Sequence, residues 1–472
     1  MKSQRLFLLQ VMGLLALLVL VNSRVIAAEL EWTACPVPRD RVRCGMLSVP
    51  ENWAQQSSSR TIRVHFVHVA ARDLDNRKSD PVAVLTGGPG VSIYYAYESM
   101  QKLAVNQTRD VIAMEPRGYG YSDPWLGCAG VDELANCYAK AKAEGIDVTQ
   151  YTTSASVRDY EALRHALGYD RWNIAGVSYG TYWSSQYARM YPESIRSIVM
   201  DSPYPLHAGY DWNRVAALNA LELVFNDCRA DSNCNRAFPD LRQRFVQTML
   251  RLIDQPDQWG ETLIGPHEAF DPIFHTVYIS TSLHRTPILV DALARGDYQA
   301  FFDLAHISPF SVPEGIDTSR LRSLGLNASM LCMEDIFYPA SVETRVAFTA
   351  AWPEAIVKVI NPEGWDYDRR CAAWPVPRHD PVINTQPQID IPSLVMVGGY
   401  DPVTPPEFAE AMLLHMNQGT LALDPSTAHV LFLNTENTCI AHIMQRFIDD
   451  PAAHQDLSCL VRRKPVPWQL PD

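Results

Sequence analysis

Short apolar runs in the first half of the chain predict the strands of a buried sheet. Thr61–Val69 alternates apolar and polar residues, which is the period of a half-buried strand. Pro81–Leu85, Val111–Met114 and Ile195–Met200 are continuous apolar runs, as in central strands that are covered on both faces. A helix is predicted at about Ser154–Leu167. Strands that alternate with helices indicate an α/β fold with a mostly parallel, doubly covered sheet.

The middle of the chain breaks this strand rhythm. Leu206–Cys228 and Leu241–Ile253 have helical periodicity, and few strand patterns occur before Ile391–Val397 and the short run Leu421–Leu423. We therefore expect a mainly helical cap that folds over the strand ends, excludes water and shapes a pocket. The chain then divides into a first core part, a cap and a second core part: 29–205, 206–375 and 376–472.

The first 28 residues have the pattern of an export signal. Lys2 and Arg5 give a basic start, Leu6–Val21 is an apolar run, and Val25–Ala28 offers small residues for cleavage. We expect residues 1–28 to be a signal peptide and the mature protein to be periplasmic or extracellular. The run is also about the minimum length for a membrane span, so an uncleaved anchor is the alternative.

One strand-to-helix junction carries a pattern with chemical meaning. The apolar run that ends at Val177 breaks into Gly-x-Ser-x-Gly, and a helix is predicted from Tyr182 to Tyr191. Strand, sharp turn and helix in this order are what a nucleophile elbow requires, with Ser178 at the apex and its hydroxyl exposed. The two glycines allow a turn too tight for residues with a Cβ. The alternative is an ordinary Gly-rich turn without a chemical role.

Two further Gly-rich segments follow predicted strands. Thr86–Gly90 comes after the first central strand, and Glu115–Ser122 comes after the next. In open parallel sheets, ligands bind outside the carboxyl ends of the strands. All three Gly-rich breaks fall at such ends, so we expect one site there.

Together these blocks resemble the α/β-hydrolase fold and, within it, the secreted tripeptidyl and prolyl aminopeptidase family of serine exopeptidases. Two departures border the site: Thr86 stands where the family usually has His, and Glu115-Pro116 stands where it usually has Asp-Gln. The blocks that carry the resemblance are Gly87–Gly90, Arg117–Ser122, Gly176–Gly180 and Gly398–Pro405.

The residues of a catalytic triad occur in the chain order of this fold. Asp401 follows the strand Ile391–Val397, and His429 follows the last short strand. The order Ser178, Asp401, His429 is that of α/β-hydrolases. In such a triad the serine attacks, the histidine carries the proton and the aspartate orients the imidazole. An Asp-Pro turn and a structural histidine are the alternatives.

The turn Gly87–Gly90 has a role in the same chemistry. Acyl transfer places negative charge on a carbonyl oxygen, and preorganised N–H groups stabilise that charge. The N–H of Tyr179, directly after the nucleophile, is one expected donor. The resemblance implies the N–H of Gly88 as the second. A plain tight turn is the alternative.

An aminopeptidase must also hold the free ammonium of its substrate, and a partly buried carboxylate does this by charge-assisted hydrogen bonds. Glu334 and Asp335, in the predicted cap, are the candidates for this anchor. The alternative is a solvated acidic helix start, which the helix dipole would favour.

An even number of cysteines behind an export signal predicts five disulfides. Their spacing in near-neighbour pairs favours the pairing of consecutive cysteines, although sequence does not fix connectivity and buried free thiols are the alternative. The ten are Cys35, Cys44, Cys128, Cys137, Cys228, Cys234, Cys332, Cys371, Cys439 and Cys459.

Composition excludes several classes of function. The formal net charge of −13 argues against a nucleic-acid partner, which would require a basic surface. The chain has no phosphate-binding loop of the Gly-x-x-x-x-Gly-Lys kind and no Cys-x-x-Cys or His-x-x-x-His cluster for zinc. We therefore expect no metal and no cofactor. The oligomeric state stays open.

Three functions remain compatible with the sequence. The first is a secreted serine aminopeptidase that releases short, tripeptide-like fragments or proline-containing residues from free N-termini. The second is a carboxylesterase or lipase on the same scaffold, since one fold hosts many chemistries. The third is a catalytically inactive binding domain. The Gly-Gly-Pro-Gly block, the cysteine layout and the acidic pair favour the first.

Overall fold

The computed structural model describes residues 29–128, 133–206, 212–305, 312–334, 349–360, 367–379, 381–461 and 465–471. The predicted signal segment 1–28 and Asp335 lie outside these residues. None of the described helices combines the length and the apolar character needed to span a bilayer.

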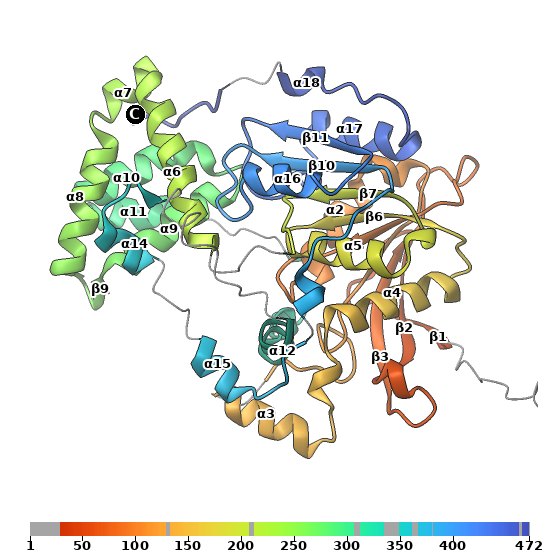
Figure 1. Ribbon diagram of the computed structural model, residues 1–472. Helices are drawn as coiled ribbons and strands as arrows, with labels where there is room; N and C mark the ends of the chain where they lie inside the picture. The colour runs from red at the N-terminus through yellow and green to blue at the C-terminus, as the bar shows by residue number, and fades with distance from the viewer. Residues whose placement is uncertain are drawn as a thin grey trace, which may run out of the picture.

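A nine-stranded sheet forms the centre of the core (Figure 1). Its strand order is β1-β2-β3-β5-β4-β6-β7-β10-β11. The three neighbouring pairs from β1 to β5 are antiparallel, and the five from β5 to β11 are parallel. The predicted α/β class with a mostly parallel sheet is thus confirmed. The strands are β1 Glu29–Thr33, β2 Val42–Pro50, β3 Thr61–Val69, β4 Val82–Leu85, β5 Val111–Met114, β6 Trp172–Val177, β7 Ile195–Asp201, β10 Ser393–Gly398 and β11 Gly419–Asp424.

Helices cover both faces of this sheet because alternate residues of the central strands are apolar on both sides. In β4, Ala83 and Leu85 join one buried cluster, whereas Val82 and Val84 join the other. Helices α4 (Thr153–Ala166), α5 (Tyr179–Met190) and α16 (Pro406–Leu413) pack on the first face. Helices α2 (Tyr97–Lys102) and α17 (Thr438–Asp449) pack on the second.

A second, helical lobe lies beside the carboxyl ends of the strands (Figure 1). It has its own buried apolar cluster, which also takes in Tyr400 and Ala428 from the core. We call this lobe the cap. Its elements are α6 Trp212–Ala230, α7 Ser232–Ala237, α8 Leu241–Asp254, the hairpin β8 Asp257–Trp259 and β9 Thr262–Ile264, α9 Pro266–Tyr278, α10 Thr286–Ala294, α11 Tyr298–Ala305 and α14 Glu354–Ile360.

Part of the segment expected to form the cap packs elsewhere. Helices α12 (Leu324–Glu334) and α15 (Tyr367–Ala373) lie apart from the cap, beside α3 (Leu134–Ala143) of the core (Figure 1). Leu326, Met330 and the neighbouring Trp374 belong to the apolar cluster under the sheet. The helical segment between residues 206 and 375 therefore does not form one layer, because α12, together with Trp374 directly after α15, buries apolar side chains against the core.

The ten cysteines form five disulfides between consecutive cysteines, as the spacing favoured. The pair Cys228–Cys234 joins α6 to α7 in the cap, and the pair Cys332–Cys371 joins α12 to α15. The remaining pairs are Cys35–Cys44, Cys128–Cys137 and Cys439–Cys459.

Candidate active site

Ser178 lies in a sharp turn between β6 and α5, and its side chain is half-buried. Its backbone has φ +55° and ψ −124°, a strained conformation that only the surrounding structure can hold. The N–H of Ser178 donates to the carbonyl of Asp201 at 2.8 Å, and the Thr181 hydroxyl donates to the carbonyl of Ser178 at 2.7 Å. Helix α5 begins at Tyr179, earlier than the predicted Tyr182, because the turn passes directly into the helix.

The glycines on either side of Ser178 are required by close approaches. A Cβ on Gly180 would lie 2.1 Å from the carbonyl oxygen of Leu85, and a Cβ on Gly176 would lie 2.3 Å from the Ser184 hydroxyl. Any larger residue would push α5 away from the sheet. The pattern Gly-x-Ser-x-Gly is therefore a packing requirement of this junction as well as a motif.

Asp401 and His429 form a buried hydrogen-bonded pair. Nδ1 of His429 lies 2.8 Å and 3.0 Å from the two carboxylate oxygens of Asp401. The carboxylate also accepts from the backbone N–H groups of Val403 (2.9 Å) and Thr404 (2.8 Å) and from the Thr404 hydroxyl (2.9 Å). These bonds fix the carboxylate, which in turn fixes the imidazole with its proton on Nδ1.

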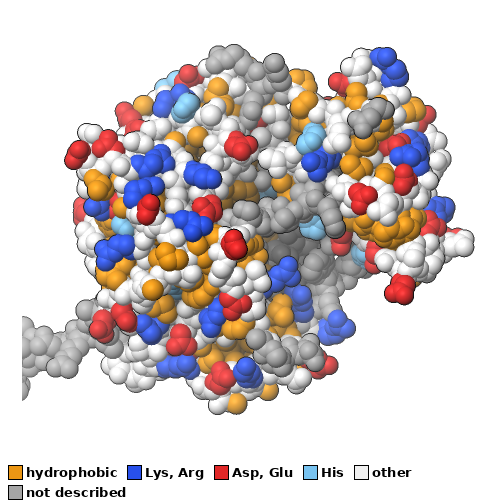
Figure 2. Space-filling view, turned by 180° about the vertical axis from the view of Figure 1, so that it is seen from behind, with side chains coloured by type: hydrophobic (Ala, Val, Ile, Leu, Met, Phe, Trp, Pro, Cys, Tyr) orange, Lys and Arg blue, Asp and Glu red, His pale blue; other side chains and the backbone are white. Residues whose placement is uncertain are grey.

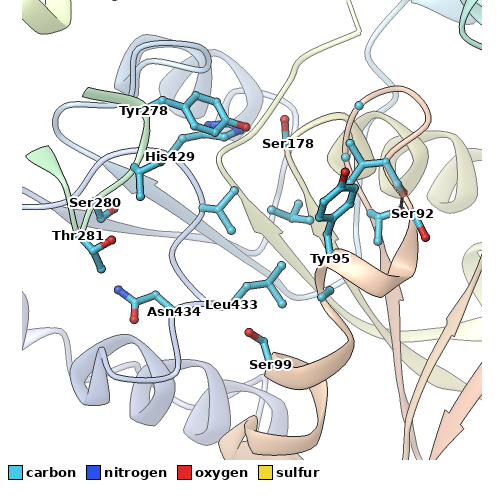
Figure 3. Close-up of a pocket in the computed structure, with 18 residues that line it drawn as sticks. Ser92, Tyr95, Ser99, Ser178, Tyr278, Ser280, Thr281, His429, Leu433 and Asn434 are labelled. Carbon is cyan, nitrogen blue, oxygen red and sulfur yellow. Dashed lines mark hydrogen bonds between the residues drawn. The ribbon is translucent and has the colours of Figure 1, made fainter. Parts of the chain in front are cut away.

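The other nitrogen of His429 faces the reaction space. Nε2 is buried and has no hydrogen-bond partner in the described part of the chain. His429 and Ser178 line the same cavity, of about 280 Å³ (Figure 3). An unprotonated Nε2 in a cavity shared with a serine hydroxyl is the arrangement of a general base and a nucleophile.

The glycine turn after β4 lies against Ser178. A Cβ on Gly87 would be 3.1 Å from the Cβ of Ser178, and Gly88 lines the cavity. Neither the Gly88 N–H nor the N–H of Tyr179, the first residue of α5, donates a hydrogen bond to any described residue. Both amides are therefore available to an oxygen that develops charge near Ser178.

The cap contributes residues to the cavity wall that could not be predicted from the sequence. Tyr278, the last residue of α9, places its ring 4.8 Å from the imidazole of His429. Ile279 pairs with His429 as an isolated parallel bridge, and Ser280 and Thr281 continue along the cavity (Figure 3). No motif or periodicity marks these residues, because their role depends on where the cap meets the core.

The described lining of the cavity carries no fixed charge. It contains no Asp, Glu, Lys or Arg. Its polar side chains, several of them labelled in Figure 3, are Thr86, Ser92, Tyr95, Ser99, Ser178, Tyr278, Ser280, Thr281, His429 and Asn434.

Glu334, predicted as an ammonium anchor, does not reach this cavity. Its side chain is fully buried at the end of α12, where it accepts from Thr153 Oγ1 at 2.6 Å and from the Tyr179 hydroxyl at 3.1 Å. Burial raises the pKa of Glu334 to about 7, against the opposing effect of these hydrogen bonds. The prediction for Glu334 is corrected, because its carboxylate is buried and already accepts hydrogen bonds from Thr153 and Tyr179. Asp335 lies outside the described residues.

Of the two departures from the family pattern, Thr86 lines the cavity, whereas Glu115 is not among its lining residues. The Thr86 hydroxyl donates to the carbonyl of Val91 at 2.8 Å and closes the glycine turn. Glu115 is fully buried, and it accepts from the Ser92 hydroxyl at 2.6 Å and from the Ile93 N–H at 3.1 Å. Burial raises the pKa of Glu115 to about 7. Neither side chain adds a charge to the cavity surface.

Two other features of the described residues bear on ligands. They contain no group of three or more His, Cys, Asp and Glu side chains placed to hold a metal ion. On the face shown in Figure 2, charges of both signs are interspersed over the described residues, and Lys and Arg form no continuous stripe there.

Comparisons with known proteins bear on the fold and the family of the chain. Residues 80–261 match the family model of the alpha/beta hydrolase fold, and residues 359–459 match that of TAP-like proteins. The chain is 24% identical to the putative hydrolase YuaR of Escherichia coli (strain K12), over 92% of this chain and 93% of that protein. It is 24% identical to a tripeptidyl aminopeptidase of Streptomyces lividans, over 82% of this chain and 78% of that protein. These matches confirm the resemblance found in the motifs.

Solved structures with a similar course of the chain include a proline iminopeptidase of Mycobacterium smegmatis. It is 16% identical, with a TM-score of 0.42, and the match covers 86% of this chain and 98% of that one. A thermophilic esterase of Thermogutta terrifontis is 13% identical, with a TM-score of 0.40, over 86% of this chain and 99% of that one.

Proposed function

Because the chain belongs to the α/β-hydrolase fold family, we propose that it is a serine aminopeptidase that works through an acyl-enzyme at Ser178. It releases short, tripeptide-like fragments or proline-containing residues from free N-termini. The observation that carries the proposal is the buried His429–Asp401 pair, whose free Nε2 shares a cavity with Ser178. The relatives named tripeptidyl aminopeptidase support a peptide as the substrate.

The proposed reaction uses this chain's residues in two steps. The Ser178 hydroxyl attacks the scissile carbonyl while Nε2 of His429 takes its proton, and the same nitrogen then gives that proton to the leaving amine. A water molecule, deprotonated by His429, releases the acyl fragment and restores Ser178. Asp401 stabilises the imidazolium in both steps. The N–H groups of Gly88 and Tyr179 hold the oxyanion, each contributing about 2.7–4 kcal/mol.

Export is part of the proposal. Five disulfides are typical of proteins that fold in an oxidising compartment. We infer that residues 1–28 direct the chain to the periplasm or the cell exterior, where its peptide substrates are found.

Ester hydrolysis is the second candidate, and one observation favours it. The described lining of the cavity offers no carboxylate to a substrate ammonium. An aminopeptidase therefore needs an anchor from another segment, and Asp335 remains our candidate for that role. An esterase with an uncharged acyl group would need none.

A comparison of three chromogenic substrates tests the proposal. They are a tripeptide p-nitroanilide with a free amine, the same compound N-acetylated, and p-nitrophenyl acetate. We expect cleavage of the free tripeptide and at most slow cleavage of the acetylated one. Turnover of the ester alone would leave an esterase, and equal cleavage of both peptides would indicate an endopeptidase.

Two variants identify the nucleophile in the same assay. Ser178→Ala is expected to lower kcat by about 10³-fold or more on every substrate that the protein cleaves. Ser57→Ala, at an exposed serine that is not among the lining residues of the cavity, is the matched control and should leave kcat unchanged. Activity retained in Ser178→Ala would rule out the acyl-enzyme mechanism.

A further inference from the structure

The loop that carries His429 is tied to the end of a neighbouring strand by three consecutive backbone amides. Asp201 is the last residue of β7, and one of its carboxylate oxygens accepts from the N–H groups of Leu431 and Phe432, each at 2.7 Å. The next residue, Ser202, accepts from the N–H of Val430 at 2.9 Å through its hydroxyl. The three residues after His429 are thus held by two adjacent side chains.

This loop would not keep its shape unaided. Val430 has φ +66°, in the left-handed region that a β-branched residue rarely adopts. Ser202, its hydrogen-bond partner, has φ +55°. Such conformations cost roughly 1–3 kcal/mol each and persist only where surrounding contacts determine them. The bonds from Asp201 and Ser202 are contacts of that kind.

Asp201 also contacts the turn that carries Ser178. Its backbone carbonyl accepts from the N–H of Ser178 at 2.8 Å, so one residue holds the nucleophile turn through its main chain and the His429 loop through its side chain. Strands β6 and β7 are neighbours with parallel register, and Val177 pairs with Asp201. Asp201 is therefore bonded both to the turn that carries Ser178 and to the loop that carries His429.

The charge of Asp201 is set by this environment. Its side chain is fully buried, and within the described residues no Lys or Arg forms an ion pair with it. Burial raises the pKa of Asp201 to about 7, while the amides of Phe432 and Leu431 and the nearby His429 oppose the rise. Asp201 is not the imidazole's own partner, because Nδ1 of His429 is bonded to Asp401.

We propose that Asp201 is a positioning residue of the hydrolase: its carboxylate fixes the Leu431–Phe432 backbone and its carbonyl fixes Ser178, so that Nε2 of His429 is held in the cavity that the serine hydroxyl also lines. Nothing in the family match or in the motifs assigns it a role. The proposal rests on the proposed function in one respect, since it takes Ser178 and His429 to be nucleophile and base.

Substitutions at Asp201 separate positioning from folding. Asp201→Ala removes both bonds to the loop, whereas Asp201→Asn keeps an oxygen that can accept them. Because a misalignment of about 1 Å can lower a rate by about 100-fold, we expect kcat of Asp201→Ala to fall by about 10- to 100-fold with KM changed by less than about twofold. Asp201→Asn should recover most of the loss. Both p-nitrophenyl acetate and the free-amine tripeptide anilide serve as substrates.

The matched control is a buried aspartate at the amino end of another central strand. Asp110 precedes β5, is 1% exposed, and bonds to His68 and Tyr169. Asp110→Asn should lower the melting temperature but leave kcat of the folded protein unchanged. If Asp201→Ala does not fold, Ser202→Ala, which removes one bond to the loop, carries the test with an expected fall in kcat of about 2- to 10-fold.

The outcomes distinguish this proposal from the proposed function. Full activity in Asp201→Ala, or in Ser202→Ala where the first does not fold, would overturn positioning by this pair while leaving Ser178 as nucleophile. A loss in Asp201→Asn as large as in Asp201→Ala would also overturn it, because geometry would then not be what Asp201 provides. Activity that survives Ser178→Ala would instead remove the proposed function itself.

Discussion

The backbone around His429 is held on one side by the core and on the other by the cap, and the two sides are anchored differently. On the core side, Asp201 and Ser202 end a buried central strand and bind three amides. On the cap side, the Ser280 hydroxyl accepts from the N–H of Ala428 at 2.9 Å, and the Tyr278 carbonyl accepts from that of His429 at 3.3 Å.

The two sets of bonds differ in the structural element that supports the residues making them. Behind Asp201 is a strand with parallel neighbours on both sides, β6 and β10. Tyr278 and Ser280 are carried by the helical cap, which has its own apolar cluster; this cluster also takes in Tyr400 and Ala428 from the core. We infer that the core sets the catalytic geometry, and that the cap adjusts it and shapes the pocket. Changes on the core side should therefore have larger effects.

The largest effect is expected at Asp401, which belongs wholly to the core side. Asp401→Asn should lower kcat by about 10⁴-fold with little change in KM, because an amide neither stabilises the imidazolium nor selects the tautomer with a free Nε2. Steady-state kinetics on p-nitrophenyl acetate measures this. A fall of less than about tenfold would mean that the other buried carboxylate, Asp201, can serve as the orienting acid.

A smaller effect concerns the stability of the core. Burial raises the pKa of Glu115, beneath the cavity wall, to about 7, so between about pH 4.5 and 7 the folded form binds a proton that the unfolded form has lost. Its contribution to stability therefore falls as pH rises through that window. Glu115→Gln mimics the protonated acid, and should raise the free energy of unfolding by roughly 2–3 kcal/mol more at pH 8 than at pH 5.

Denaturant unfolding at the two pH values measures this difference. Glu144→Gln, at an exposed position of the core, is the control and should show the same small change at both. A Glu115→Gln variant with equal changes at pH 5 and pH 8 would contradict a raised pKa for Glu115.

The smallest effect is expected on the cap side. Ser280→Ala removes the single bond to the Ala428 N–H, and one such bond is worth about 0.5–1.5 kcal/mol, so kcat should fall by about 2- to 10-fold. Ser280→Thr keeps the hydroxyl and should retain activity. If Ser280→Ala lost as much activity as Asp201→Ala, the core side would not be the dominant support of the loop, and the comparison above would be wrong.

The comparison of core and cap also explains which parts of the site and of the fold could be predicted from the sequence. Ser178, Asp401 and His429 each follow an apolar run, so their place at strand ends could be predicted from local pattern, and the structure brings them to one site. The strands β3 to β7, β10 and β11 of the central sheet could be predicted for the same reason, whereas the cap hairpin of β8 and β9 was not predicted. Strand β2 was missed because Cys44, Gly45 and Pro50 interrupt its apolar pattern.

Residues that act through tertiary contacts gave no local signal. Asp201, Tyr278 and Ser280 meet the His429 loop only after the sheet and the cap are assembled, and no motif contains them. The expectation for Glu334 was wrong for a related reason: exposure of a carboxylate is a property of packing, and α12 buries this one against Thr153 and Tyr179.

Mass spectrometry of the products from a peptide of about ten residues with a free N-terminus tests aminopeptidase action most directly. We expect short fragments to leave from the N-terminus in sequence, the N-acetylated peptide to stay intact, and Ser178→Ala to leave both uncut. Cleavage within the acetylated peptide, or no cleavage of either peptide by a protein that turns over p-nitrophenyl acetate, would contradict an aminopeptidase.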